Sequence, residues 1–215
     1  MNATLSWALW LSASVWVTAA GTLSLPAQPP TSRAARIARD VRAGDVRASV
    51  ALGEAVGILT QRDRSYPESE LDAVADSLVV IALMFPGDSA KAVNTRGRAM
   101  AAIMRAGTAL NSGTPYKGAA SRLRRIALGG RGVGASAVFG LTRLPDRSEA
   151  LRELATVARS NVRTARVAVE FLATDMDDAG VQVLKELHDA SEVTEPSAQK
   201  QLLRIARDKG WRTTT

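Results

Sequence analysis

The sequence predicts an all-α protein, on three observations. Of its 215 residues, 46% are hydrophobic but only 4% are aromatic. A chain rich in Ala, Val, Leu and Arg favours helices packed through small side chains over a β-sandwich or barrel. Apolar residues recur at helical spacing in segments of roughly 12 to 20 residues between turn signals. No stretch alternates apolar and polar residues, as a half-buried strand does, for more than a few positions.

The N-terminal segment reads as an export signal. No charged side chain precedes Arg33, and the apolar run LSWALWLSASVWVTAAGTLSL is followed by PAQPP. An apolar stretch that ends in small residues is typical of a signal peptide and its cleavage site. We expect residues 1–27 to be a signal peptide, cut after Ala27 or Ala20, and residues 28–32 to be a linker. The protein would then be exported to the periplasm or beyond.

An uncleaved membrane anchor is the alternative for this segment. Leu5 to Leu25 covers about 20 residues, which is enough to cross a bilayer. Trp7 could lie at the membrane interface, and the basic stretch after the segment would favour a cytoplasmic body.

The rest of the chain, after the N-terminal segment and linker, is expected to form a helical repeat domain over residues 33–210 and a tail over residues 211–215. The chain has no cysteine, so disulfides and thiolate metal sites are excluded.

Turn signals divide the domain into about ten helices joined by short connections. Asp146 or Ser148 can cap the helix EALRELATVARS, Pro196 suits the first turn of the last helix, and Gly210 suits its end. The run SLVVIALMF at Ser77 continues ESELDAVAD without a break, so we predict the end of a buried helix there. The turn signals are AGD at Ala43, RDRSYPES at Arg62, FPGDS at Phe85, NSGTP at Asn111, GGRG at Gly129, LPDRS at Leu144, ATDMDD at Ala173 and VTEPS at Val193.

The helix expected between Val162 and Leu172 is apolar over more than half of its circumference. Only Arg163, Arg166 and Glu170 cluster on the opposite side. Such a helix must be covered from two sides, so it needs a neighbour beyond its own hairpin. This requirement predicts a stack of helix pairs.

A recurring sequence pattern also favours stacking. The segments ALRELA and VLKELH share a Leu-basic-Glu-Leu pattern, and their leucines, Leu151 and Leu184, are 33 residues apart. A similar offset separates Leu141, at the end of VFGL, from Leu172 in EFLA. A period of this size suits a repeated helix pair.

Two stretches carry, at their third and fourth positions, a Val-Arg pair typical of the start of the second helix of a HEAT repeat. They are GDVRASVALGEAVGIL at Gly44 and SNVRTARVAVEFL at Ser160. On these residues the chain resembles the HEAT-repeat and armadillo-like α-solenoids, most closely over residues 132–191. The resemblance implies a right-handed stack of antiparallel helix pairs whose surface serves as a non-catalytic binding scaffold.

The Asp-rich turn DMDDAGVQVLKE invites a calcium interpretation. Asp175, Asp177, Gly180 and Glu186 occupy positions 1, 3, 6 and 12 of an EF-hand loop. Ala179 at position 5 removes one ligand, and no second loop is evident. The favoured interpretation is structural: Asp177 or Asp178 caps the next helix, and Glu186 lies on its exposed face.

Catalytic and nucleotide chemistry find little support. The glycines of GGRGVGAS follow a helical segment where a P-loop needs a strand, and the Lys-Ser/Thr of a P-loop is missing. A tight turn between closely packed helices explains them better. His188 is the single histidine, and no nucleophile and base can be paired. We therefore expect no enzyme activity, no cofactor and no metal.

Positive charge is concentrated in the middle of the chain. Ten basic and no acidic residues lie between Asp88 and Asp146, whereas the rest of the chain has 18 basic and 21 acidic residues. Consecutive helix pairs are neighbours in a repeat stack, so this block would become a patch that attracts an acidic partner. A solvated arginine face is the structural alternative. The expected contact centre of the patch is Lys117, Arg122, Arg124, Arg125 and Arg131.

These features predict an exported scaffold that binds a protein partner or an anionic component of the cell envelope, such as lipid phosphate. The alternative is a membrane-anchored or cytoplasmic form that binds nucleic acid or another polyanion through the same patch. Such phosphate contacts would weaken steeply with salt.

Overall fold

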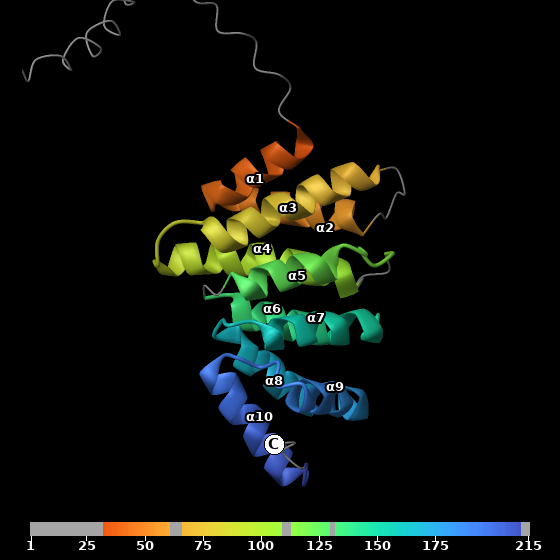
Figure 1. Cartoon of the computed structure of the whole chain (residues 1–215). Helices are drawn as coiled ribbons and strands as arrows, with labels where there is room; N and C mark the ends of the chain where they lie inside the picture. The colour runs from red at the N-terminus through yellow and green to blue at the C-terminus, as the bar shows by residue number, and fades with distance from the viewer. Residues whose placement is uncertain (1–31, 61–65, 109–112, 130–131, 212–215) are drawn as a thin grey trace, which may run out of the picture. The chain divides into compact units, whose positions relative to one another are not determined.

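The computed structural model describes residues 32–60, 66–108, 113–129 and 132–211. Within these ranges the chain forms ten α-helices and no strand, as the sequence predicts (Figure 1). The expected signal peptide and all but the last residue of the expected linker lie outside the described residues, as does the tail from residue 212. Among the described helices, none combines the length and apolar character that a membrane span requires.

The ten helices follow one another with mostly short connections. Their bounds are α1 (Arg33–Ala43), α2 (Val46–Leu59), α3 (Glu68–Met84), α4 (Ala90–Thr108), α5 (Ala119–Leu128), α6 (Gly134–Thr142), α7 (Arg147–Arg159), α8 (Thr164–Thr174), α9 (Asp177–Asp189) and α10 (Pro196–Asp208).

Local chemistry sets several helix ends where the sequence predicts them. The carboxylate of Asp146 accepts a hydrogen bond from the Glu149 backbone N–H at 2.9 Å, which caps α7. Pro196 occupies the first position of α10, and Gly210 after its last turn has a φ of 67°, which glycine adopts without steric cost. The run from Ser77 onward forms the end of α3, so the prediction of a helix rather than a strand is confirmed.

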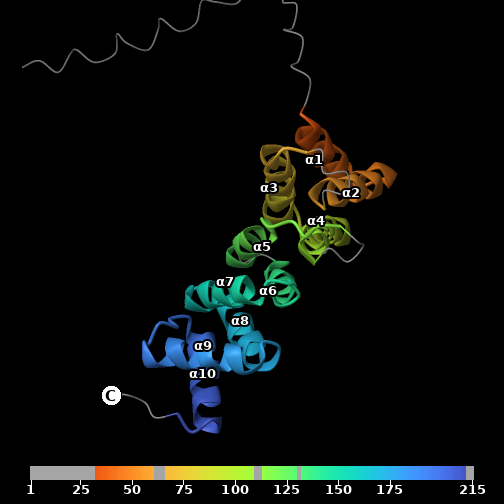
Figure 2. The same ribbon diagram turned by 90° about the vertical axis from the view of Figure 1, so that its right-hand side faces the viewer.

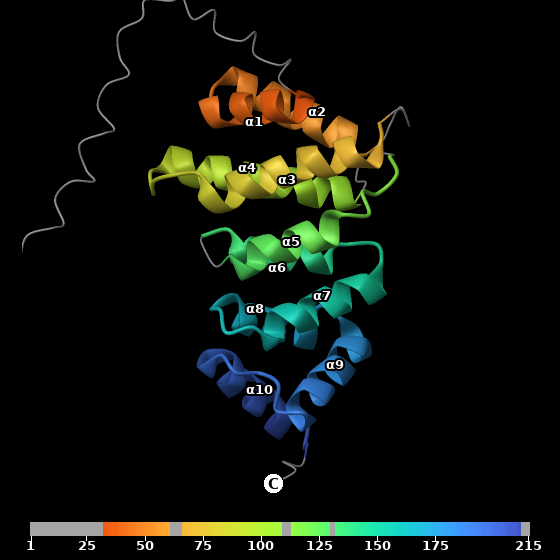
Figure 3. The same cartoon turned by 45° about the horizontal axis from the view of Figure 1, so that its top comes forward.

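The helices form two layers. Consecutive helices pack as the pairs α1/α2, α3/α4, α5/α6 and α7/α8, and each helix also packs against the helix two positions along the chain. The odd layer is therefore α1, α3, α5, α7 and α9, and the even layer is α2, α4, α6, α8 and α10. Figure 2 separates α3, α5 and α7 from α4 and α6, and Figure 3 shows the pairs in chain order. The two layers enclose one hydrophobic core, which includes Ile37, Leu59, Leu78, Ile103, Leu123, Leu141, Leu154 and Leu172.

Helix α8 is covered from several sides, as its sequence requires. It packs against α6, α7, α9 and α10. Ala165, Ala168, Val169 and Leu172 are completely buried. The expectation that this helix contacts more than its own hairpin partner is confirmed.

Small residues bring some helices unusually close together. A Cβ atom added to Gly180 in α9 would lie 2.1 Å from the backbone oxygen of Leu172 in α8. A Cβ atom added to Gly134 would lie 2.8 Å from a side-chain carbon of Thr164. These glycines permit backbone packing that any larger residue would prevent.

Candidate binding surface

The predicted contact centre contains Arg122, which faces α3 rather than open solvent. Its Nη2 lies 2.9 Å from Asp72 Oδ1, and its Nε lies 3.4 Å from Asp76 Oδ1. Only 15% of the Arg122 side chain is exposed. Its charge is therefore largely offset by two carboxylates of the neighbouring odd helix.

Arg124 and Arg125 are also engaged within the odd layer. Arg125 Nη1 lies 2.5 Å from Asp76 Oδ1, so Asp76 contacts two arginines of α5. Arg124 Nη1 lies 2.9 Å from Glu153 Oε2 in α7, and Glu153 is buried. The three arginines thus join α5 to α3 on one side and to α7 on the other.

The other two residues of the predicted centre differ from these. Lys117 is exposed on the segment before α5, and Arg131 lies outside the described residues. The ion pairs of Arg122 and Arg125 arise because α3 carries four acidic and no basic residues, whereas α5 carries three basic and no acidic residues. The sequence block of positive charge is therefore partly neutralised by the helix stacked next to it.

Charge is segregated by layer instead. The helices of the odd layer contain eleven basic and eleven acidic residues, whereas those of the even layer contain nine basic and three acidic residues. One of the three, Glu54, accepts hydrogen bonds from Arg33 and Arg36 of α1, which lower the pKa of its carboxyl despite the opposing effect of partial burial. The even layer therefore presents a net positive surface.

Most basic side chains of the even layer have no carboxylate beside them in the described part of the chain. Within the described ranges, no carboxylate oxygen lies at ion-pair distance from seven of the nine. The exceptions are Arg47, which contacts Asp45, and the buried Arg96, which contacts Asp88 and donates to the carbonyls of Phe85 and Gly87. The seven are Lys91, Arg98, Arg105, Arg166, Lys200, Arg204 and Arg207.

The α2–α4 groove, of about 380 Å³, runs between two helices of this layer. Its lining combines small and apolar side chains with two arginines. Arg98 Nη2 donates a hydrogen bond to Ser49 Oγ at 2.7 Å, which links the two helices across the groove. The lining residues are Ser49, Leu52, Gly53, Val56, Gly57, Arg98, Ala101, Ala102 and Arg105.

A second basic hollow, of about 710 Å³, lies over α10 at the end of the stack. Arg166 of α8 and Lys200, Arg204 and Arg207 of α10 line it. Leu203, also in its lining, is 46% exposed. The basic residues of the even layer thus gather in two places, on α4 and over α10, and α6 between them carries no charged residue.

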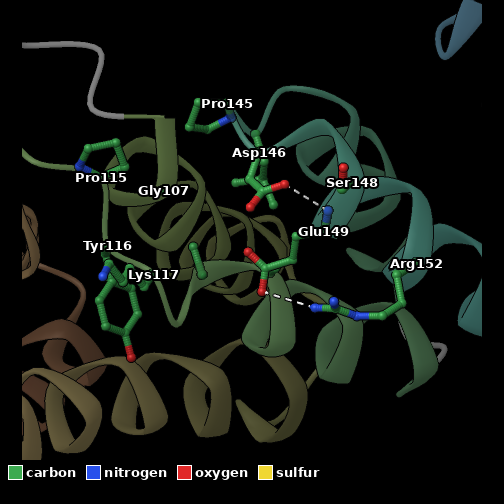
Figure 4. Close-up of a pocket in the computed structure, with 12 residues that line it drawn as sticks. Gly107, Pro115, Tyr116, Lys117, Pro145, Asp146, Ser148, Glu149 and Arg152 are labelled. Atoms are coloured by element: carbon green, nitrogen blue, oxygen red, sulfur yellow. Dashed lines mark hydrogen bonds and ion pairs between the residues drawn. The ribbon is translucent and has the colours of Figure 1, made fainter.

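Lys117 lines a different pocket, of about 490 Å³, between the segment before α5 and the start of α7 (Figure 4). The Tyr116 hydroxyl points away from this pocket, towards α3. Glu149 lies 3.5 Å from Arg152, and burial together with the nearby Asp146 carboxylate raises the pKa of its carboxyl. These groups stabilise the start of α7, and within the described residues they form no nucleophile and base pair.

The Asp-rich turn does not have the geometry of a calcium loop. Helix α9 begins at Asp177, so Gly180 and Glu186 are helical, and Glu186 is displaced from Asp177 by about 13 Å along the axis. Arg147 Nη2 donates to the Asp175 carbonyl and lies 3.2 Å from Asp177 Oδ2. The described part of the chain holds no cluster of three or more candidate metal ligands.

The predicted cap of α9 is wrong. The residue before the helix is Met176, which makes no side-chain capping bond, and Asp177 has a φ of 53°. Its carboxylate pairs with Arg147 because the stack places the start of α7 beside this turn. The expectation that Glu186 is exposed is confirmed, and its carboxylate accepts a hydrogen bond from Gln182.

Gly134 and His188, the other candidate residues from the sequence, are buried between packed helices. Gly134 is buried at the start of α6, and α5 precedes the glycine-rich segment, so a helix stands where a P-loop needs a strand. His188 is buried, with its ring centroid 5.8 Å from that of Trp211 and its Nδ1 3.2 Å from Asp189 Oδ1. It packs between the last two helices.

Sequence reasoning missed the even-layer surface because it grouped charges by position along the chain. Summing the charge separately over the odd-numbered and the even-numbered predicted helices could have revealed it, because the two sums differ sharply. Arg98 and Arg105 belong to the central basic block, but Arg166, Arg204 and Arg207 lie far outside it.

No protein-family model, curated protein or solved structure matches the chain. Val46-Arg47 opens α2 and Val162-Arg163 immediately precedes α8, so both Val-Arg pairs introduce helices of the even layer.

Proposed function

We propose that the chain is a non-catalytic binding scaffold, built as a right-handed HEAT-like α-solenoid, whose even layer holds an acidic protein partner. The stacking of alternate helices supports this fold. Leu151 and Leu184, the leucines of the recurring Leu-basic-Glu-Leu pattern, lie on the odd helices α7 and α9. Both Val-Arg pairs introduce even helices. Recurring sequence features thus fall on helices of the same layer, which supports the proposal.

The charge difference between the two layers carries the functional part of the proposal. A protein gains little from leaving arginines unpaired on one face, whereas a partner with complementary charge is attracted and oriented by them. In the described residues, every arginine of the odd layer except Arg42 lies within ion-pair distance of a carboxylate, as Arg124 does of Glu153. The even layer leaves Arg98, Arg105 and Arg204 available.

The proposed compartment is the periplasm or the exterior of the cell. The apolar, uncharged start of the sequence supports export, and the absence of cysteine is compatible with it. An uncleaved N-terminal anchor is the alternative.

A second candidate is binding of nucleic acid or another polyanion by the same surface in an anchored or cytoplasmic form. One observation favours it: Phe139 and Phe171 form an aromatic pair on even helices, with ring centroids 5.9 Å apart. The Arg143 guanidinium lies 4.6 Å from the centre of the Phe139 ring. Aromatic and guanidinium groups together suit stacking against bases.

The test compares charge reversal on the two layers. The variant R98E/R105E removes charge from the even layer, and R39E/R152E makes the same change at exposed positions of the odd layer. Binding of the full chain to a polyglutamate peptide and to single-stranded DNA is measured by calorimetry at low salt. We expect R98E/R105E to weaken polyglutamate binding by about tenfold or more, corresponding to about 1.4 kcal/mol, and R39E/R152E to change it less than about twofold.

A third variant, R125E, examines the predicted centre on α5. If R125E weakens polyglutamate binding more than R98E/R105E does, the contact centre lies on the odd layer. Equal loss in all variants would show attraction by net charge alone and contradict the scaffold proposal. Binding of DNA without polyglutamate would favour the second candidate.

A further inference from the structure

The α2–α4 groove combines the features that a partner helix needs, beginning with two arginines that have no carboxylate partner among the described residues. Arg98 and Arg105 lie seven residues apart on α4, so they line the same side of the groove with a separation of about 10.5 Å along the helix. Each can pair with a carboxylate of a bound partner. Acidic residues two turns apart on a helix match this spacing.

The floor of the groove is open to close approach. A Cβ atom added to Gly53 or Gly57 would meet no atom within 4 Å, so the fold itself does not require glycine at these positions. Glycine destabilises a helix interior relative to alanine. Gly53 and Gly57 are one turn apart on α2, and their missing side chains let another backbone lie close to the helix.

Exposed valines border the groove on α2. Val46 and Val50 are 81% and 67% exposed. Val46, Val50, Gly53 and Gly57 share one face of α2 by helical spacing. The resulting strip is apolar, exposed and bordered by positive charge.

The polar groups of the groove favour a helix over an extended peptide. An extended backbone has unpaired N–H and C=O groups that must be satisfied when they leave water. The groove lining has no amide side chain, and its one hydroxyl, that of Ser49, already accepts a bond from Arg98. A helix satisfies its own backbone and brings only side chains.

We propose that the α2–α4 groove receives one amphipathic helix of an acidic protein partner. Small and apolar residues of that helix lie against Gly53, Gly57 and the valines, and its carboxylates pair with Arg98 and Arg105. The proposal rests on the proposed function, because it names the partner element that the even layer binds.

The experiment fills the groove without changing its charge. The variant G53L/G57L places two leucines one turn apart in the floor, and S69L/A73L places two leucines with the same spacing on exposed positions of α3. The probes are a lactam-stapled helix of Ala, Leu and Glu with glutamates two turns apart, and a glycine-rich peptide of equal glutamate content that stays unfolded. Affinities for the full chain are measured by fluorescence anisotropy, with duplex DNA and anionic phospholipid vesicles as further probes.

The wild-type chain should bind the stapled helix about tenfold more tightly than the unfolded peptide. G53L/G57L should lose this preference and melt at no lower a temperature, and S69L/A73L should retain it. Equal affinity for both peptides, unaffected by the leucines but lost in R98E/R105E, would overturn the groove while leaving the proposed function intact. Binding of only DNA or vesicles would overturn both.

Discussion

The hydroxyl of Tyr116 donates a hydrogen bond of 2.5 Å to Oδ1 of Asp72, which lies 44 positions earlier in the chain. The same carboxylate oxygen lies 2.9 Å from Arg122 Nη2, and the Arg122 guanidinium lies 5.7 Å from the centre of the Tyr116 ring. One aspartate of α3 thus holds both the segment before α5 and α5 itself. This cluster joins the second helix pair to the third.

Replacing Tyr116 by phenylalanine should lower the free energy of unfolding by about 1–2 kcal/mol, because the buried ring stays but its hydrogen bond is lost. Tyr66→Phe is the matched control, since its hydroxyl accepts a bond from Arg33 at an exposed position. Urea unfolding should show a change of less than about 0.5 kcal/mol for the control. Equal effects of the two variants would contradict the role of Tyr116.

The same pair predicts a dependence on alkaline pH. Burial, and then the hydrogen bond to Asp72, raise the pKa of the Tyr116 hydroxyl far above its ordinary value. A raised pKa means that the folded state holds the proton more tightly. The stabilisation is therefore complete below pH of about 10 and is lost as pH rises above it, by about 1.4 kcal/mol per pH unit. The difference in unfolding free energy between wild type and Tyr116→Phe should shrink accordingly, and a constant difference would argue against it.

Arg124 and Arg125 are neighbours that should respond differently to substitution. Arg124 pairs with Glu153, whose side chain is only 6% exposed, whereas Arg125 pairs with Asp76, whose side chain is 44% exposed. Arg124→Met leaves a buried carboxylate with a weaker partner and should destabilise the fold by about 2–3 kcal/mol. Arg125→Met should cost about 0–1 kcal/mol. Thermal unfolding of both variants measures the difference, and the reverse order would show that the Glu153 pair is dispensable.

Two glycines within helices should respond to alanine with opposite signs. Gly180→Ala places a methyl group against the Leu172 carbonyl and should destabilise the protein by about 1–3 kcal/mol, because α9 must move away from α8. Gly53→Ala adds its methyl group in open space and should stabilise by about 0.5–1 kcal/mol. Chemical denaturation tests both, and a neutral Gly180→Ala would mean that the α8–α9 contact adjusts freely.

Calcium should leave the melting temperature unchanged. Asp177 is paired with Arg147 in the structure, and Glu186 lies further along α9. We expect millimolar calcium to produce no thermal shift, and Glu186→Gln to behave as wild type with or without the ion. A calcium-dependent rise in melting temperature that Glu186→Gln abolishes would restore the EF-hand interpretation.

The proposed export predicts a shortened protein. Expressed in a bacterial host with a C-terminal tag, the chain should appear in the envelope fraction with an intact mass that lacks residues 1–27 or 1–20. Mass spectrometry of each fraction measures this. A full-length mass in the membrane or cytoplasm would favour the anchored form and strengthen the nucleic-acid candidate.

The sequence by itself determined the all-α class, the number of helices and several of their ends. These properties depend on interactions within a few residues: apolar periodicity, the cap at Asp146, the proline at position 196 and the glycine at position 210. The helix around Val169, apolar over more than half of its circumference, also required cover from two sides, which indicated stacking before any contact was known. Such local and compositional signals are present in one sequence.

Only the tertiary structure decided which charges meet. Arg122 and Asp72 are 50 positions apart, and their contact depends on how α5 stacks on α3. The same stacking paired three arginines of the predicted basic patch with carboxylates and left basic residues on alternate helices without such partners among the described residues. It also moved Asp177 from a cap to a partner of Arg147. Coulomb interactions act between neighbours in space, and the stacking of the helices determines who those neighbours are.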